Sequence, residues 1–342
     1  MMHWNDFLSA NGAQLKDGQV KHFGSPENEA EATLHGNIIA DLSHLSIVEI
    51  TGQDAEEFLH GQFTNDLKTL DKYKLQSSAW CNAKGQVLAN FYIFKHNAGL
   101  TLLLPTDLKS KFIKRLQMFV LMSDVIINDK SNELGLIGIS INKIIERLNI
   151  VIDSIPEEPA TVIETENYTC IRIFDSNLRI ILIGTTNILE KNWSQLTACL
   201  VPVGTLQWEL LDILSGFPWV TSACTEKFLP QYLNMDLLGG LSYDKGCYPG
   251  QEVIARLHYR GKIKRRLFLA DSQQPSPPTV GDAIYAGNKN IGSIINVQPH
   301  PEFGYLLLAV IEIDKVRSES VTINNIDGSI LSIHELPYSL NA

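Results

Sequence analysis

The strongest constraint on the fold is a change in the pattern of short apolar runs near Gly261. Before this glycine, strand-length apolar runs alternate with stretches of helical periodicity, and after it short runs separated by Gly, Pro and Asn dominate. Alternating strands and helices predict a mixed region, whereas closely spaced short strands are typical of a small barrel or sandwich. The chain is therefore expected to divide into residues 1–260 and a β-rich unit of residues 261–342.

Two successive units of strands and helices are expected within the first region, with a break near residue 130. Strand-length runs bounded by Gly, Asn or Pro occur at 46–50, 76–81, 86–95, 100–104, 125–128, 134–140, 168–174 and 178–184. Apolar residues at helical spacing occur at 106–120, 141–149, 187–199 and 205–215. The similar order of elements predicts α+β units of the split βαβ type.

Three local features complete this prediction. The first forty residues are polar and are expected to form loop and one short helix. The segment from Thr51 to Asp54 has the pattern of a capping box that opens a short helix ending near His60. Residues 221–250 form a long polar stretch, and long ordered loops of this kind are often functional.

Composition and charge exclude several classes of protein. The 28 Lys and Arg residues against 38 Asp and Glu residues give a net charge of −10, which argues against a general nucleic-acid coat. No apolar run is long enough for a membrane helix, and the first residues lack the pattern of a secretory signal. The five cysteines are scattered without a CxxC pair, as in reduced cytosolic proteins. We therefore expect a cytoplasmic protein with no membrane segment and no metal centre.

The segment from Lys245 to Glu252, with the sequence KGCYPGQE, carries the most chemical information. Gly246 and Gly250 bracket Cys247, so the backbone there can adopt conformations that other residues avoid. Lys245 and, further along, Arg256 give the thiol electropositive surroundings, which favour the reactive thiolate. The alternative is a small buried apolar side chain in a tight loop, and the residues alone leave the two interpretations equal.

This segment resembles the signature of the YgfZ family, folate-binding proteins linked to iron–sulfur cluster assembly or repair. Other segments resemble the same family, so that the resemblance extends over most of the chain. They are Gly61–Asp66 (GQFTND), Cys81–Gly85 (CNAKG), Trp208–Pro218 (WELLDILSGFP) and Phe228–Asn234 (FLPQYLN).

The resemblance implies the fold of the glycine-cleavage aminomethyltransferase (T-protein) superfamily. In that fold, two ferredoxin-like subdomains and a C-terminal small β-barrel surround a central folate channel. The implied cofactor is tetrahydrofolate or a derivative, and the implied partners are iron–sulfur client enzymes or assembly proteins. Cys247 would be the essential thiol, with Lys245 and Arg256 stabilising its thiolate. The folate-binding residues would be Trp208, Asn65, Asp66, Lys84, Gln251 and Glu252.

Simpler roles compete with these functional ones. Trp208 lies in a helical pattern, and core packing is the commonest role of such an aromatic residue. The basic run from Arg256 to Arg266 could be a solvated surface, could receive the glutamate tail of a folate, or could contact RNA phosphates. No aromatic-interleaved RNA motif accompanies the run, so the folate tail ranks above tRNA.

The alternative function is a folate-dependent one-carbon transferase that acts on an amine or a tRNA base. Aminomethyltransferases carry a catalytic Asp after the strand that corresponds to 100–104, and Leu104–Lys111 has no Asp at the expected position. An iron–sulfur maintenance factor is therefore favoured, and a folate-binding regulator without thiol chemistry is a third hypothesis. The thiol could form a mixed disulfide, a one-carbon adduct or a bridge to a cluster. Stable cluster binding is the weakest of these, because a lone cysteine cannot fill four thiolate positions.

Overall fold

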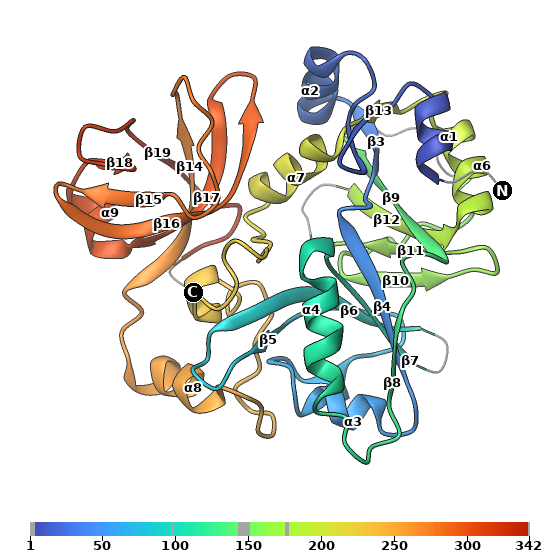
Figure 1. Cartoon of the computed structure of the whole chain (residues 1–342), viewed down its shortest axis with the longest axis horizontal. Helices are drawn as coiled ribbons and strands as arrows, with labels where there is room; N and C mark the ends of the chain where they lie inside the picture. The colour runs from blue at the N-terminus through green and yellow to red at the C-terminus, as the bar shows by residue number, and fades with distance from the viewer. Residues whose placement is uncertain (1–3, 97–98, 143–150, 175–177, 341–342) are drawn as a thin grey trace.

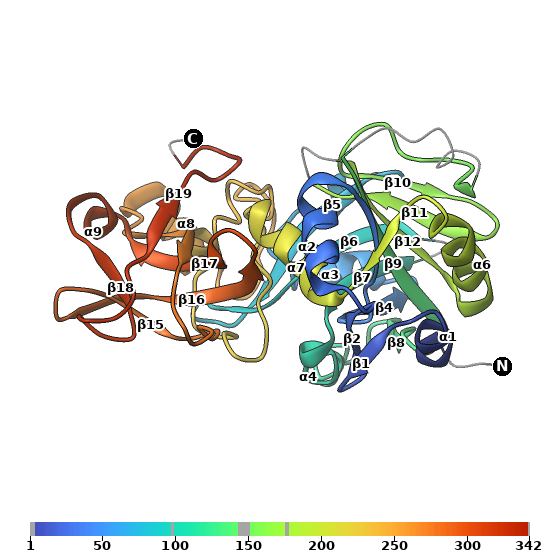
Figure 2. The same cartoon turned by 90° about the horizontal axis from the view of Figure 1, so that it is seen from above.

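The computed structural model describes residues 4–96, 99–142, 151–174 and 178–340. Within these residues, three main sheets and their helices form an α+β fold, as predicted. Two of the sheets lie together, and the C-terminal sheet stands on the other side of helix α7 (Figures 1 and 2). None of the helices in the described ranges is long and apolar enough to cross a membrane.

The first sheet is antiparallel and has the strand order β5-β6-β7-β4-β8. Its strands are β4 (Leu45–Thr51), β5 (Leu75–Cys81), β6 (Val87–His96), β7 (Gly99–Pro105) and β8 (Ile126–Asp129), with helices α3 (Ala55–His60), η1 (Leu67–Thr69) and α4 (Thr106–Gln117). The predicted strands of this unit are confirmed. Helix α4 buries Leu108, Phe112 and Leu116, which recur every four residues along one face.

The predicted capping box before α3 is wrong, although the helix ends at His60 as expected. Thr51 is the last residue of β4 and pairs with Ile126 of β8, so it cannot serve as the helix cap. The helix begins after Asp54, whose carboxylate accepts a hydrogen bond from the backbone of Asp124 instead. Thr51, which the local sequence pattern predicts as the helix cap, is therefore part of the sheet instead.

The second sheet has the strand order β10-β11-β12-β9-β3-β13 and is antiparallel except for the parallel pair β3–β13. Its strands are β3 (Asn37–Asp41), β9 (Leu134–Ile141), β10 (Thr161–Glu164), β11 (Tyr168–Arg172), β12 (Leu178–Thr185) and β13 (Val201–Val203), with helices α2 (Pro26–His35), α6 (Thr186–Leu196) and α7 (Thr205–Leu214). The predicted pairing of the strands near 168–174 and 178–184 is confirmed. The predicted helix at 141–149 falls largely on residues outside the described ranges.

The expectation that the first forty residues are irregular is wrong. They contain α1 (Trp4–Ala10), β1 (Gln14–Lys16), β2 (Gln19–His22), α2 and most of β3. Strand β3 lies inside the second sheet, between β9 and β13, with Ile38, Ile39 and Ala40 fully buried. A strand covered on both faces has no alternation of polar and apolar residues, so a short one gives little signal in a sequence.

The C-terminal sheet is antiparallel and has the order β18-β15-β16-β17-β14-β19. Its elements are β14 (Arg265–Ser272), β15 (Ala283–Ala286), β16 (Lys289–His300), β17 (Gly304–Glu312), α9 (Ile313–Ser318), β18 (Val321–Ile323) and β19 (Ser332–His334). The sheet curls around a core of its own (Figure 1). The β-rich character predicted beyond Gly261 is confirmed.

Helix α7 lies where the sheets meet (Figure 1). Trp208 and Leu211 pack into the core of the second sheet, whereas Leu210 and Ile213 join the core of the first sheet. Glu209 and Asp212 of this helix both line the space between the sheets, because residues three apart share a helix face. Residues 221–250 form an extended loop, as expected, with the short helix η2 (Pro230–Leu233), and α8 (Gln251–Arg260) follows.

Candidate functional site

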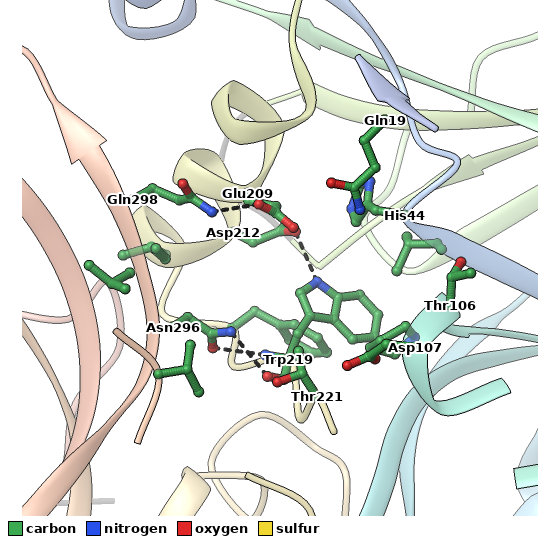
Figure 3. A pocket seen from close by; sticks show the side chains of 16 residues that line it. Gln19, His44, Thr106, Asp107, Glu209, Asp212, Trp219, Thr221, Asn296 and Gln298 are labelled. Carbon is green, nitrogen blue, oxygen red and sulfur yellow. Dashed lines mark hydrogen bonds between the residues drawn. The ribbon is translucent and has the colours of Figure 1, made fainter. Parts of the chain in front are cut away.

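A central cavity of about 380 Å³ opens between α7, the first sheet and the C-terminal sheet (Figure 3). Helix α7 and the segment after it contribute Glu209, Asp212 and Trp219. The C-terminal sheet contributes Asn296 and Gln298. The remaining lining residues are Gln19, His44, Leu45, Pro105, Thr106, Asp107, Ile213, Phe217, Thr221, Val280 and Val297. The size and the mixture of aromatic and polar groups are those of a small-molecule site.

Hydrogen bonds hold the indole of Trp219 at the wall of this cavity. Its Nε1 donates to Asp212 Oδ2 at 2.9 Å, and its backbone N–H donates to Asn296 Oδ1 at 3.0 Å (Figure 3). The other oxygen of Asp212 accepts from Arg179 Nη2 at 2.5 Å, and both members of this ion pair are buried. The indole is thus fixed in position by a buried charged pair.

Two titratable groups in the cavity have pKa values far from their usual range. Burial raises the pKa of Glu209 to about 7, and the nearby carboxylate of Asp212 adds to the rise. Glu209 Oε2 accepts a hydrogen bond from Gln298 at 2.5 Å. Burial, reinforced by the charge of Arg179, lowers the pKa of His44 to about 4. Both ring nitrogens of His44 are buried without a hydrogen-bond partner, so the neutral imidazole has a donor and an acceptor free for a ligand.

Trp208 lies outside this cavity. It is 1% exposed, and its ring packs so closely on β9 that a Cβ at Gly138 would lie 2.6 Å from it. The guanidinium of Arg179 also stacks over the ring, 4.3 Å from its centre. The tryptophan that borders the cavity is Trp219, and nothing in its sequence context distinguishes it from a core residue.

The Cys247 loop, residues 245–250, forms a second candidate site. Cys247 is exposed, whereas Cys81, Cys170 and Cys224 are buried and Cys199 is half-buried. The loop ends at Gly250, whose backbone has the left-handed φ of 83°. A Cβ there would lie 2.5 Å from the carbonyl oxygen of Asn82, so a glycine is required for the loop to lie against this turn.

The side chain of Lys245 ties this loop to the end of helix α3. Its buried ammonium group donates to the backbone carbonyls of His60, Phe63 and Asn65, at 2.6 Å for Phe63 and 3.2 Å for Asn65. It also lies 4.9 Å from the ring centre of Tyr248. Burial lowers the pKa of Lys245 to about 8. The ammonium group of Lys245 therefore donates its hydrogen bonds to the backbone, and these bonds hold the loop in place.

Three other predicted residues lie around this loop. The amide of Asn65 donates to the carbonyls of Ser77 and Gly239 at 2.8 and 2.7 Å. Asp66 Oδ1 lies 3.3 Å from His60 Nδ1. The amide of Gln251 donates to the carbonyl of Lys245 at 3.2 Å. These residues organise the surroundings of Cys247 and line no part of the central cavity.

The remaining predicted residues lie further out. Lys84 is exposed in the turn that the Cys247 loop contacts. Glu252 and Arg256 are exposed on α8 and border a shallow depression with Arg260. In the basic run, Arg266 is buried and forms a bidentate pair with Asp236 at 2.6 and 2.9 Å, so it is a structural residue. None of the residues Arg256–Arg266 lines the central cavity.

Comparisons with known proteins agree with this architecture. The model of the GCVT N-terminal domain matches residues 7–148. The tRNA-modifying protein YgfZ of Blochmanniella pennsylvanica is 31% identical over 250 residues, which cover 71% of this chain and 76% of that protein. The protein of the same name from Photorhabdus laumondii is 28% identical over 324 residues, or 93% of this chain and 97% of the relative.

A solved structure shares the whole fold. The glycine cleavage system aminomethyltransferase T from Bartonella henselae superposes with a TM-score of 0.80 over 98% of this chain and 96% of its own. Its sequence is 15% identical, so the likeness concerns the fold alone. The expected aminomethyltransferase-like architecture is thereby confirmed.

Proposed function

This chain belongs to the YgfZ family, and we propose that it binds a reduced folate in the central cavity and uses the thiol of Cys247 to support assembly or repair of iron–sulfur clusters in cytoplasmic client enzymes. The observation that carries the proposal is the exposed cysteine on a loop that is fixed by a buried lysine. A thiol that serves other proteins must be accessible, and a rigid loop presents it in one geometry.

The contrast among the cysteines supports a special role for Cys247. Burial raises the pKa of Cys81 and Cys224 above the usual range, and it raises that of Cys170 to about 12. These thiols stay protonated and shielded at neutral pH, so they are poor nucleophiles. Cys247 is the exposed cysteine of the chain.

The central cavity fits the pterin end of a folate. The pterin is a flat ring with amide and amine groups, and Trp219 offers an aromatic wall while Glu209, Gln298 and the unpartnered nitrogens of His44 offer donors and acceptors. None of the 16 lining residues drawn in Figure 3 is Lys or Arg. The anionic glutamate tail would therefore extend out of the cavity. Bound tetrahydrofolate supplies one-carbon chemistry, and the chain would orient it and exclude water.

A one-carbon transferase acting on an amine or a tRNA base is the second candidate. Glu209 favours it, because a half-buried carboxyl with a pKa near neutrality suits proton transfer at the cavity. Asp107 also borders the cavity, but its Oδ2 already accepts a hydrogen bond from the backbone of Ser222 at 2.7 Å. The names of the relatives mention tRNA modification, which would fit either an indirect or a direct role.

Complementation tests the proposal. Cells that lack their own YgfZ-type protein would express this chain as wild type, Cys247→Ser or Cys199→Ser, the last as a control in a half-buried thiol. The readout is the activity of an iron–sulfur enzyme under oxidative stress, at equal protein levels. We expect rescue by wild type and Cys199→Ser but not by Cys247→Ser. Rescue by Cys247→Ser would remove the thiol from the function, and failure of the folded wild type would direct attention to transferase assays.

A further inference from the structure

A histidine at the end of helix α3 faces the Cys247 loop, and an aspartate at the start of η1 lies beside this histidine. His60 is 7% exposed, and its Nε2 lies 3.9 Å from where a Cβ at Gly246 would stand. Gly246 has no side chain that could stand between this nitrogen and the backbone that leads into Cys247. On the other side of the ring, Nδ1 lies 3.3 Å from Asp66 Oδ1.

The imidazole of His60 has an unpartnered nitrogen, and this favours a role in proton transfer. His60 Nδ1 is buried and has no hydrogen-bond partner, while Asp66 Oδ1 stands near enough to pair with it when the ring is charged. In enzymes, a histidine held between a carboxylate and a thiol or hydroxyl activates that nucleophile by accepting its proton. Ordinary structural histidines donate or accept at both positions when buried.

The lysine of the motif maintains this arrangement. Lys245 binds the backbone carbonyls of His60 and Asn65, which lie at the two ends of the segment between the histidine and the aspartate. The loop of Cys247 and the segment of His60 and Asp66 are thereby held together. In this arrangement Lys245 positions the pair, because its ammonium group is bonded to backbone carbonyls of the segment that holds both residues.

The surroundings of His60 lower its pKa, so that the neutral ring can accept a proton. Burial and the positive charge of Lys245 lower its pKa, Lys68 acts in the same direction, and Asp66 and Glu57 oppose them. The imidazole is therefore largely neutral at physiological pH. When the neutral ring carries its proton on Nδ1, its lone pair is on Nε2, on the side of Gly246.

We propose that His60 is the proton acceptor of Cys247 and that Asp66 is the positioning residue of this pair. The S–H bond of Cys247 breaks, the electron pair stays on sulfur, and the proton passes to His60 Nε2. The resulting imidazolium is stabilised by the carboxylate of Asp66. This inference rests on the proposed function, since it explains how the thiol of that function becomes a thiolate.

Alkylation of the purified full chain by iodoacetamide tests the assignment. The rate at Cys247 would be followed by peptide mass spectrometry from about pH 6 to about pH 9, a range that spans the usual thiol pKa of about 8.5. The variants are His60→Gln and Asp66→Asn. Replacing the His60 side chain leaves its carbonyl for Lys245, and asparagine can still cap the short helix that Asp66 begins. His334→Gln is the matched control, because His334 also pairs with an aspartate, Asp271, in the C-terminal sheet.

We expect His60→Gln to slow alkylation roughly tenfold at about pH 7 and to move the midpoint of the profile up by about one pH unit. Asp66→Asn should give a smaller shift in the same direction, and His334→Gln none. Coinciding profiles of wild type and both pair variants, or an equal shift in His334→Gln, would overturn the assignment. The assay needs neither folate nor a cluster protein, so its failure is distinct from failed rescue by wild-type protein in the complementation test.

Discussion

Replacing Glu209 by Gln should change how the stability of the protein depends on pH. Burial beside Asp212 raises the pKa of Glu209 from its ordinary 4.5 to about 7. The folded protein therefore keeps this proton up to about pH 7, whereas the unfolded chain releases it near pH 4.5. Between these values the folded state binds more protons, so the free energy of unfolding falls as pH rises. The stabilisation is complete below pH 4.5 and is lost as pH passes through about 7.

The magnitude follows from the two pKa values. The interval of 2.5 pH units between 4.5 and about 7 corresponds to about 3 kcal/mol. The groups that face Glu209 are Asp212 and Asp107, which raise its pKa, and Lys21, which lowers it. Glutamine resembles the protonated carboxyl and can still pair with Gln298. The variant should therefore lack this loss and gain up to about 3 kcal/mol relative to wild type between about pH 5 and about pH 8.

Urea unfolding of both proteins at several pH values measures the effect. The quantity of interest is the difference between the two free energies of unfolding at each pH, because groups common to both proteins then cancel. Glu31→Gln, on the exposed side of α2, is the control and should leave the pH dependence unchanged. If the difference between wild type and Glu209→Gln is the same at every pH, Glu209 titrates as an exposed carboxyl and the burial argument fails.

Four further substitutions test the organisation of the two sites. Gly250→Ala should lower the free energy of unfolding by at least about 2 kcal/mol, because the left-handed φ of this residue and the carbonyl of Asn82 exclude a Cβ. Urea unfolding measures the loss, and a loss equal to that of Gly246→Ala would contradict the prediction. Lys245→Met should cost about 3 kcal/mol by leaving three carbonyls without their donor; limited proteolysis should then cut the Cys247 loop, and a resistant loop would speak against the tether. Trp208→Leu should lower the free energy of unfolding by about 3 kcal/mol and leave the affinity for folate unchanged, whereas Trp219→Leu should weaken folate binding. Calorimetric titration with folate measures both affinities. Weaker folate binding by Trp208→Leu than by Trp219→Leu would show that Trp208 belongs to the binding site.

The sequence predicts the fold where local signals and tertiary structure agree. The strands of the first sheet and the C-terminal sheet are bounded by turn residues, and the helix at 106–120 has a clear apolar face, so their existence and type follow from pattern alone. Strand β3 could not be found in this way. Its place between β9 and β13 depends on pairing across about a hundred residues of chain, which leaves no local trace.

The candidate sites likewise differ in how far the sequence predicts them. The Cys247 loop is visible in the sequence because its glycines, lysine and cysteine are contiguous. The cavity is assembled from α7, the start of α4 and β16, so its residues have no common spacing. One signal was present in the sequence: Glu209 and Asp212 are acidic residues in a largely apolar helix, at positions that share a face. Acidic residues in a helix buried on both sides require partners or a ligand, and that requirement points to a cavity.

The separation of the thiol from the cavity limits what the two sites can do together. Cys247 is not among the described residues that line the cavity, and its loop is fixed beside the last residue of α3. A one-carbon unit on a folate in the cavity would have to leave the cavity to reach the sulfur. A mixed disulfide or a bridging cluster ligand requires only that the exposed thiol meets the surface of a partner protein. Within the proposed function, these two forms of thiol chemistry are therefore favoured over a one-carbon adduct, and the folate would act by binding rather than by transfer to Cys247.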